Sequence, residues 1–307
     1  MPAYNEAKNL PRLLKEIRKT TSTLGFDFEY IIVDDGSIDD TREVVLGMTK
    51  ANPEIRYIRL SRNFGKEIAT TAGINKSRGV SCIIMDADLQ HPPKYLRDFV
   101  AAWEKGAMVV VGVRTNSKHG NFVKRIGSKY FYKIINRISP TKMVPGSTDF
   151  RLIDRRVIDV FNQLNEHNRM TRGLIDWIGF ERVDIPFEAD NRANGQAGYN
   201  IPKLIQLALN SMVSLSLFPL KLAGYLGIAI TLTSGLLGAI VFFSKFILKT
   251  PWGLSITGTG SLAIILVFLV GIILICLGLI ALYIANIYQE VYGRPLYIIQ
   301  EDTHDTD

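Results

Sequence analysis

Two acidic pairs in the first third of the chain have the spacing of a cation site. Asp34 and Asp35 follow the apolar run Tyr-Ile-Ile-Val, and Asp86 and Asp88 begin and end a D-x-D triplet that follows Cys-Ile-Ile-Met. Carboxylates one residue apart at a strand end can converge on one hard cation, which takes oxygen ligands and commonly bridges phosphates. A D-x-D triplet alone is weakly specific, but its place after a short apolar run strengthens the prediction.

The surrounding elements are expected to alternate between helix and strand. Runs rich in Val and Ile without polar alternation predict strands that are buried on both faces, hence a mostly parallel sheet covered by helices. The predicted strands are 30–34, 55–60, 82–86 and 107–113, and the predicted helices are 10–17, 41–50, 68–77 and 95–103. In such sheets a ligand binds at the carboxyl ends of the strands, where both acidic pairs fall.

Composition and missing motifs exclude several classes of protein. The 307 residues carry a net charge of +7 and only two cysteines, so a disulfide scaffold is excluded. Neither G-x-G-x-x-G nor a Walker pattern occurs, which removes the ordinary dinucleotide and P-loop interpretations. No signal peptide is recognisable, so most of the chain is expected in the cytosol, and the acidic end 301–307 is expected to fray.

Two uncharged stretches, 222–244 and 253–289, predict membrane helices. We expect a transmembrane hairpin within 222–288, with spans at about 222–247 and 259–288; two buried helices of a soluble core are the alternative. An amphipathic helix over 201–221 would lie on the membrane surface or pack on the globular domain. The basic stretch 122–138 is either a second interfacial helix or a solvated face.

Four motifs in this order resemble the signature of family-2 glycosyltransferases. They are Pro2-Ala3-Tyr4-Asn5-Glu6, Asp34-Asp35-Gly36-Ser37, Ser61-Arg62-Asn63-Phe64-Gly65-Lys66 and Asp86-Ala87-Asp88-Leu89-Gln90. Within that family, the chain is most similar to the polyprenyl-phosphate glycosyltransferases, such as dolichol-phosphate mannose synthase and the bacterial undecaprenyl-phosphate glucosyl- or N-acetylglucosaminyltransferases. Further motifs support this subgroup: Thr148-Asp149-Phe150-Arg151-Leu152, Arg172-Gly173-Leu174 and Arg192-x-x-Gly195-x-x-x-Tyr199.

The resemblance implies a fold and a domain order. An α/β GT-A nucleotide-diphospho-sugar transferase domain would occupy 1–200, followed by the juxtamembrane helix 201–221, the hairpin 222–288 and a cytosolic tail 289–307. Two departures stand out. The family has an apolar strand before Pro-x-Tyr-Asn-Glu, whereas Met1 directly precedes Pro2; and Ala197 and Gly198 stand where Ser-Lys is usual. The first departure predicts an exposed sheet edge, and the second removes a phosphate-binding lysine.

The resemblance also implies site residues. The nucleotide sugar would be bound by Pro2, Tyr4, Glu6, Asp34, Lys66, Asp86 and Arg114. Asp86, Asp88 and Gln90 would hold Mg²⁺ or Mn²⁺, and Arg125 and Arg192 would bind the acceptor phosphate. Asp149 would be the catalytic carboxylate, with a structural pairing to Arg151 or Arg155 as the alternative; His91 would cap the Pro-Pro turn or bind metal.

The implied reaction is an inverting hexose transfer from a nucleotide-diphosphate sugar, UDP-glucose or UDP-N-acetylglucosamine, to undecaprenyl phosphate. It would take place at the cytoplasmic face of a bacterial inner membrane, with both termini cytoplasmic. Membrane lipid, a separate flippase and further copies of the chain, up to a tetramer, are the expected partners; nucleic acid is not. Two alternatives stay open: a membrane-anchored nucleotide-sugar-binding protein without turnover, and a processive polysaccharide synthase, although its Gln-x-x-Arg-Trp motif does not occur.

Overall fold

The computed structural model of the protein describes residues 1–115, 144, 146–164, 166–167, 169–188, 225, 229–230, 232–233, 236 and 258–305. The chain divides into two compact units. The first comprises Met1–Gly198 together with Gly293–Asp307, and the second is Tyr199–Tyr292. The C-terminal residues therefore belong to the same unit as the acidic motifs.

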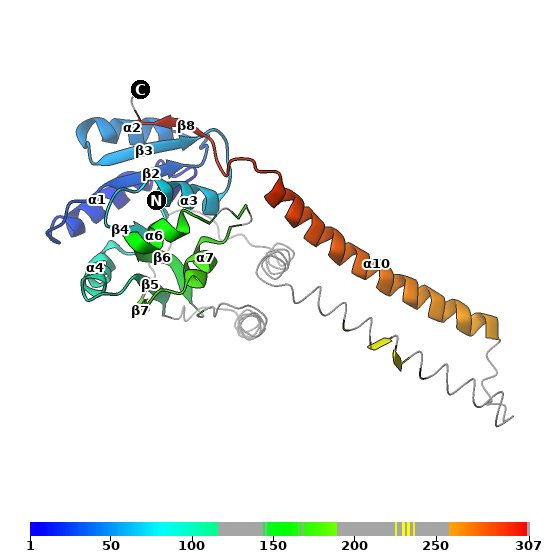
Figure 1. Ribbon diagram of the computed structural model, residues 1–307. Coiled ribbons are helices and arrows are strands. Elements are labelled where there is room, and N and C mark those ends of the chain that lie inside the picture. The colour runs from blue at the N-terminus through cyan, green and yellow to red at the C-terminus, as the bar shows by residue number, and fades with distance from the viewer. Residues whose placement is uncertain are drawn as a thin grey trace. The chain divides into compact units, whose positions relative to one another are not determined.

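The first unit contains a sheet in the order β1-β2-β3-β8. Its strands are β1 (Pro2–Ala3), β2 (Tyr30–Asp34), β3 (Ile55–Leu60) and β8 (Ile299–Asp302). The first three strands are parallel, and β8 runs antiparallel to β3. Residues near both ends of the chain therefore form strands of the same sheet (Figure 1). The predicted strands 30–34 and 55–60 are confirmed, and the strand before Tyr4 is only two residues long.

A second sheet in the same unit has the order β4-β6-β5-β7. Its strands are β4 (Ser81–Ile84), β5 (Val109–Arg114), β6 (Ser147–Asp154) and β7 (Arg182–Phe187). β6 is antiparallel to both of its neighbours, while β5 and β7 are parallel. The prediction of a mostly parallel sheet is therefore wrong for this half, because β6 enters between β4 and β5 in the opposite direction.

Helices cover both sheets. They are α1 (Leu10–Thr21), α2 (Thr41–Ala51), α3 (Lys66–Lys76), the 3₁₀ turn η1 (Pro93–Tyr95), α4 (Leu96–Glu104), α6 (Arg155–Phe161) and α7 (Thr171–Ile178). The stripe Leu10, Leu13, Leu14 and Ile17 at helical spacing is fully buried, as a one-sided amphipathic helix requires. The four predicted helices are confirmed with shifts of a few residues at their ends.

The prediction of a frayed end is wrong for residues 301–305: β8 ends at Asp302, and the residues that follow it as far as 305 are part of the described structure. Asp302 accepts hydrogen bonds from the guanidinium of Arg56, with 2.6 Å between Asp302 Oδ2 and Arg56 Nη2, and both side chains are almost completely buried. Glu301 pairs with Arg42 over 2.8 Å. These ion pairs and the ladder to β3 secure a segment whose acidic composition predicts disorder.

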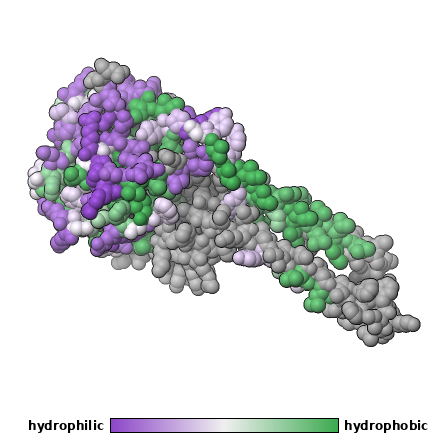
Figure 2. All heavy atoms as spheres, in the orientation of Figure 1, coloured by the Kyte–Doolittle hydropathy of each residue, from purple (hydrophilic) through white to green (hydrophobic). Residues whose placement is uncertain are grey.

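The second unit contains α10 (Gly258–Val291), a helix of 34 residues. Its described side chains are almost all exposed and apolar, and they are coloured as hydrophobic in Figure 2. Within the described residues, no helix is both long enough and apolar enough to cross a membrane. The predicted helices at 122–138 and 201–221, and most of the predicted span at 222–247, lie outside the described residues.

Candidate active site

A cleft of about 330 Å³ opens where β1, β2, β3 and β4 end. All four signature motifs contribute to it. The lining residues are Pro2, Ala3, Tyr4, Glu6, Asp35, Asn63, Gly65, Lys66, Ala69, Asp86, Ala87 and Asp88. Five of the residues predicted to bind the nucleotide sugar, namely Pro2, Tyr4, Glu6, Lys66 and Asp86, are thus brought together with the predicted metal ligand Asp88.

Lys66, the first residue of α3, connects two carboxylates at the cleft. Its Nζ lies 2.7 Å from Asp86 Oδ1 and 2.8 Å from Asp149 Oδ2. Burial lowers the pKa of Lys66, but the charges of Asp86 and Asp149 outweigh it and raise the pKa above its ordinary value. Lys66 is therefore a cation held between two anions.

Asp149, in β6, lies beside the cleft with one oxygen unused. Its Oδ1 is buried and has no hydrogen-bond partner among the described residues. Burial raises the pKa of Asp149, but Lys66 and then the nearby Arg172 and Arg151 guanidiniums lower it below its ordinary value, so the carboxylate is ionised. Of the two arginines in the structural alternative, Arg151 forms its ion pair with Asp176 over 2.7 Å, and Arg155 donates to the carbonyl of Gly79.

The loop after β4 presents Asp86 and Asp88 in a constrained backbone. His91 accepts a hydrogen bond at Nδ1 from the N–H of Asp86 over 3.1 Å and stacks on Phe150 with 5.0 Å between ring centroids. Burial lowers the pKa of His91, which keeps the ring neutral and Nδ1 free to accept. Leu89 has a φ of +64°, a left-handed conformation that costs a non-glycine residue energy and is common at functional sites.

The carboxylates present fit a divalent ion that is shared with a diphosphate. Among the described residues there is no group of three His, Cys, Asp or Glu side chains arranged to hold a metal. Mg²⁺, however, is commonly bound by one or two carboxylates plus substrate phosphates. Asp86 and Asp88, which both line the cleft, supply such a pair. The predicted ligand Gln90 does not line the cleft; its backbone N–H donates to Asp88 Oδ1.

The side chains of the adjacent residues Asp34 and Asp35 lie in different surroundings. Asp34 is completely buried, where its oxygens accept from the N–H of Ser37 at 2.7 Å and from the hydroxyl of Tyr57 at 2.6 Å. Asp35 lines the cleft and accepts from the N–H groups of Phe64 and Gly65. Asp34, which was predicted to bind the nucleotide sugar, therefore holds the turn after β2 and does not line the cleft, whereas Asp35 of the same acidic pair does.

The loop after β1 is fastened to the loop after β2. The N–H of Asn5 donates to Ser37 Oγ over 2.9 Å, and Asn5 Oδ1 accepts from the N–H of Ile38. This arrangement holds Tyr4, which is 43% exposed, and Glu6 at the cleft. Burial raises the pKa of Glu6.

The three predicted arginines are not brought to the cleft by the described structure. Arg114 ends β5 with an exposed side chain, and its backbone N–H donates to the carbonyl of Gly146. Arg125 and Arg192 lie outside the described residues. Arg172, at the start of α7, was missed as a neighbour of Asp149; its Nε is buried without a partner among the described residues. Only its place in the Arg-Gly-Leu motif pointed to it.

The fold and the cleft define a class of protein, an α/β protein with a candidate ligand site at the ends of its strands. Comparison with known proteins makes the class definite. The sequence profile of glycosyl transferase family 2 matches residues 1–161. The chain belongs to glycosyl transferase family 2, it is a glycosyltransferase, and its fold is the GT-A-like α/β fold of such enzymes.

Relatives match along almost the whole chain. An uncharacterized glycosyltransferase of Synechocystis sp. (strain ATCC 27184 / PCC 6803 / Kazusa) is 38% identical over 98% of this chain and 93% of its own length. The SfII prophage-derived bactoprenol glucosyl transferase of Shigella flexneri is 32% identical over 98% of this chain and 96% of its own. Among solved structures, mannosyl-3-phosphoglycerate synthase from Rubrobacter xylanophilus is 17% identical, with a TM-score of 0.48 over 68% of this chain and 69% of its own.

Proposed function

We propose that the protein transfers a hexose from a nucleotide-diphosphate sugar to a polyprenyl phosphate, with inversion at the sugar carbon. The observation that carries the proposal is the cleft lined by Lys66, Asp86 and Asp88, with Asp149 paired to Lys66 beside it. The bactoprenol glucosyl transferases among the relatives favour glucose as the sugar and undecaprenyl phosphate as the acceptor. UDP-glucose is therefore the first donor to test, and UDP-N-acetylglucosamine is the second.

The donor diphosphate would lie over the loop after β4. Lys66 would exchange one carboxylate partner for a phosphate oxygen, since its ammonium is charged and within reach of the cleft. Tyr4 and Asp35, which also line the cleft, would contact the nucleoside. Such contacts hold two large reactants in line, which is a major source of rate enhancement.

The acceptor needs little help from a base. Its attacking oxygen belongs to a phosphate that is already ionised near neutral pH. Asp149 would take up the residual proton of an acceptor phosphate that is still singly protonated, at the Oδ1 that has no partner in the described structure. Attack from the side opposite the leaving diphosphate would invert the sugar and give a β-linked product from an α-linked donor.

Asp86 and Asp88 would hold Mg²⁺ or Mn²⁺ against the diphosphate. The ion would neutralise the charge that grows on the departing nucleotide. His91 supports this geometry through its hydrogen bond from the Asp86 N–H.

We also propose that the protein works at a bacterial inner membrane with its globular unit and both termini on the cytoplasmic side, where nucleotide sugars are found. The exposed apolar side chains of α10 support contact with lipid, because exposed apolar patches of this extent mark interaction surfaces. A lipid-linked acceptor would then meet the cleft at the membrane surface. Assembly as an oligomer and a separate flippase for the product remain part of the proposal.

A transfer assay tests this function. Full-length protein in detergent or liposomes is mixed with undecaprenyl phosphate, Mg²⁺ and radiolabelled UDP-glucose or UDP-N-acetylglucosamine, and the lipid phase is extracted and counted. Label should enter the lipid phase with one donor and disappear when EDTA is added. Tight donor binding without any transfer would instead identify a nucleotide-sugar-binding protein, and a growing polymer would identify a synthase.

A further inference from the structure

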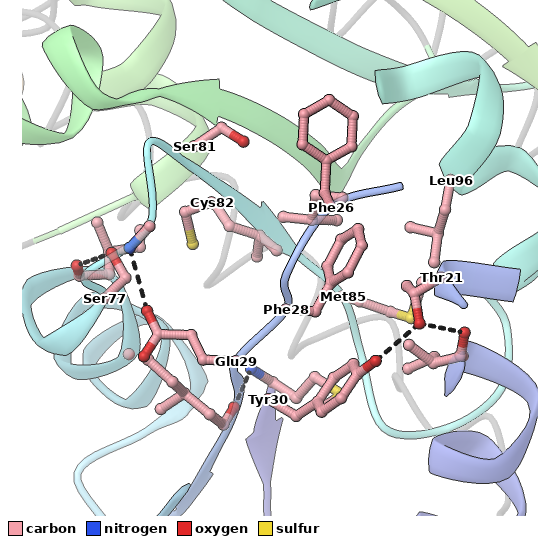
Figure 3. Close-up of a pocket in the computed structure, with 18 of the residues that line it drawn as sticks. Thr21, Phe26, Phe28, Glu29, Tyr30, Ser77, Ser81, Cys82, Met85 and Leu96 are labelled. Atoms are coloured by element: carbon pink, nitrogen blue, oxygen red, sulfur yellow. Dashed lines mark hydrogen bonds between the residues drawn. The ribbon is translucent and has the colours of Figure 1, made fainter. Parts of the chain in front are cut away.

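The helix α3 is held along one face and at its far end. Its buried face packs on β2 in one core cluster. Just after the helix, Glu29 Oε1 accepts hydrogen bonds from the N–H groups of Arg78 and Gly79. Figure 3 shows Glu29 and Ser77, the residue that follows α3, at the wall of a cavity of about 170 Å³ that residues of β2 and β4 also line. Side chains at the start of α3 therefore stand on a rigid support, which is what a precise site needs.

The first two residues of α3 reach two different segments of the chain. Lys66 Nζ lies 2.8 Å from Asp149 Oδ2 in β6. Glu67 Oε2 accepts a hydrogen bond over 2.8 Å from the N–H of Thr171, the first residue of α7 and 104 positions away. One dipeptide thus links the proposed catalytic carboxylate and the start of α7 to the same support.

The contact of Glu67 is a helix cap that comes from another helix. The first N–H groups of a helix have no partner within it, and Met170, which precedes α7, makes no side-chain cap hydrogen bond. Thr171 is only 4% exposed, so its N–H would be costly to leave unpaired. Glu67 supplies a charged acceptor at the end of α7 where the helix dipole is positive.

A buried arginine joins the same turn of α7 to the strand that carries Asp149. Arg151 is 1% exposed, and its Nη1 donates to the carbonyl of Arg172 over 3.2 Å. Its Nε donates to the carbonyl of Thr148 over 3.1 Å. Arg151 also forms its ion pair with Asp176, further along α7. The first turn of α7 is therefore held from two sides, by α3 and by β6.

This turn of α7 carries Arg172 close to Asp149. Burial raises the pKa of Asp149, but the charges of Lys66 and then Arg172 lower it below its ordinary value. Because the interaction of two charges weakens with distance, Arg172 must be a near neighbour of the carboxylate. The Nε of Arg172 is buried and has no hydrogen-bond partner among the described residues. Unpaired buried donors are rare, and a catalytic role is among the reasons that they persist.

We propose that Glu67 is a positioning residue of the active site, which caps α7 and so holds Arg172 beside Asp149. The inference rests on the proposed function, in which Asp149 takes up the residual proton of the acceptor phosphate. Glu67 does not line the cleft and acts through α7. A cation fixed beside Asp149 stabilises the charged carboxylate and restricts where it lies, and the placement of reacting groups is a major source of rate enhancement.

The test compares full-length variants in the transfer assay. Glu67→Ala should lower kcat about tenfold and leave the KM for the donor within about twofold, because a misplaced group slows the reaction more than it weakens donor binding. Glu67→Gln keeps an oxygen that can accept the Thr171 N–H, so it should keep most of the wild-type kcat. Glu43→Ala is the control: it removes a carboxylate from the first turn of α2, where the side chain is 65% exposed, and should keep full activity.

Two further measurements separate positioning from a general loss of structure. In a chain that already carries Arg172→Met, Glu67→Ala should have little further effect on kcat, because residues that act through one another are not additive. Amide exchange over residues 171–174, followed by mass spectrometry, should be at least about tenfold faster in Glu67→Ala than in the wild type, since the first turn of α7 loses its cap. Glu67→Gln should exchange as the wild type does.

Four outcomes would overturn the positioning role. They are a wild-type kcat in Glu67→Ala, an equal loss of kcat in Glu67→Gln, a loss that multiplies with that of Arg172→Met, and equal exchange in Glu67→Ala and the wild type. The second of these would assign the effect to the charge of Glu67 near Lys66. Absence of transfer by the wild type with every donor would overturn the proposed function and with it any role in catalysis, and the exchange measurement would then decide only whether Glu67 caps α7.

Discussion

Lys66 donates a hydrogen bond from Nζ to Asp149 Oδ2 over 2.8 Å, although 83 positions separate the two residues in the chain. The contact joins the start of α3 to β6, and Asp86 completes it from the loop after β4. The carboxylates of Asp86 and Asp149 share the ammonium of Lys66, so Lys66 partly neutralises both negative charges beside the cleft.

Replacement of Lys66 by Met should remove the positive charge that both carboxylates share. Asp86 and Asp149 would then face each other without a cation, and the diphosphate would lose a positive contact. We expect kcat/KM for the donor to fall about 10²-fold, equivalent to about 2.7 kcal/mol of transition-state stabilisation. Steady-state kinetics with labelled UDP-glucose measure this. Lys94→Met is the control, because Lys94 Nζ lies over the ring of Tyr95 outside the cleft, and it should keep full activity.

Asp149→Asn tests the carboxylate itself. The amide keeps the size of the side chain and loses the carboxylate that would take up the residual proton of the acceptor phosphate. The expected result is a fall in kcat of at least about 10²-fold, in the range usual for a group that assists proton transfer or positioning, with a small change in the KM for the donor. An unchanged kcat in a folded variant would make Asp149 a structural residue.

Asp88→Ala tests the proposed metal site. Loss of one of two carboxylate ligands should abolish transfer at millimolar Mg²⁺, because the remaining ligands come from Asp86 and the substrate. Activity is measured over a titration of Mg²⁺ and Mn²⁺. Asp98→Ala is the control, because it also removes one carboxylate, at an exposed position in the first turn of α4. Its activity should depend on the concentrations of Mg²⁺ and Mn²⁺ as that of the wild type does. Wild-type turnover in Asp88→Ala would contradict the metal assignment.

Asp302→Asn tests the C-terminal strand. The substitution removes the buried partner of Arg56 and leaves it only the half-exposed Asp305 at 3.5 Å, which costs about 3 kcal/mol of the free energy of unfolding. Asp305→Asn is the control: Asp305 is 54% exposed, and its ion pairs should contribute less than about 1 kcal/mol. Chemical denaturation measures both, and a loss in Asp302→Asn no larger than in the control would contradict the role of this pair.

The ion pair between Asp302 and Arg56 also makes the free energy of unfolding depend on pH. Burial raises the pKa of Asp302, but the Arg56 guanidinium outweighs it and holds the pKa below the ordinary value of 3.8. A carboxyl group whose pKa is lower in the folded state than in the unfolded state stabilises the fold at pH values above the unfolded-state pKa. This stabilisation is lost as the pH falls through the folded-state pKa. The difference in unfolding free energy between wild type and Asp302→Asn should therefore be constant near neutral pH and shrink below pH 3.8. A difference that stays constant into that range would contradict the assignment.

Much of the local structure follows from the sequence. The runs Tyr30–Asp34 and Ile55–Leu60 are strands with the predicted ends, and the Leu stripe of α1 is buried. Period and composition determine these elements because each one must bury its own apolar face. The four signature motifs meet at one cleft because parallel strands share the edge at which they end.

Other features could not be deduced from local pattern. Asp34 and Asp35 are adjacent and chemically identical, and only the course of the chain after β2 decides that Asp34 is buried against Tyr57 while Asp35 reaches the cleft. The acidic end of the chain has the composition of a frayed tail, yet Arg56, 246 positions earlier, pairs with Asp302. Such long-range pairs leave no periodic signal.

The amino-acid sequence by itself determined the family, the positions of most helices and strands, and the set of carboxylates from which the site is built, because motifs and hydrophobic periods are local properties. The tertiary structure alone decided the direction of β6 and the pairing of β8 with β3. It also decided the placement of Lys66 between Asp86 and Asp149, and the cavity lined by residues of β2 and β4. Each of these depends on which distant segments pack together, and that choice is made by the free energy of the whole core and not by any one segment.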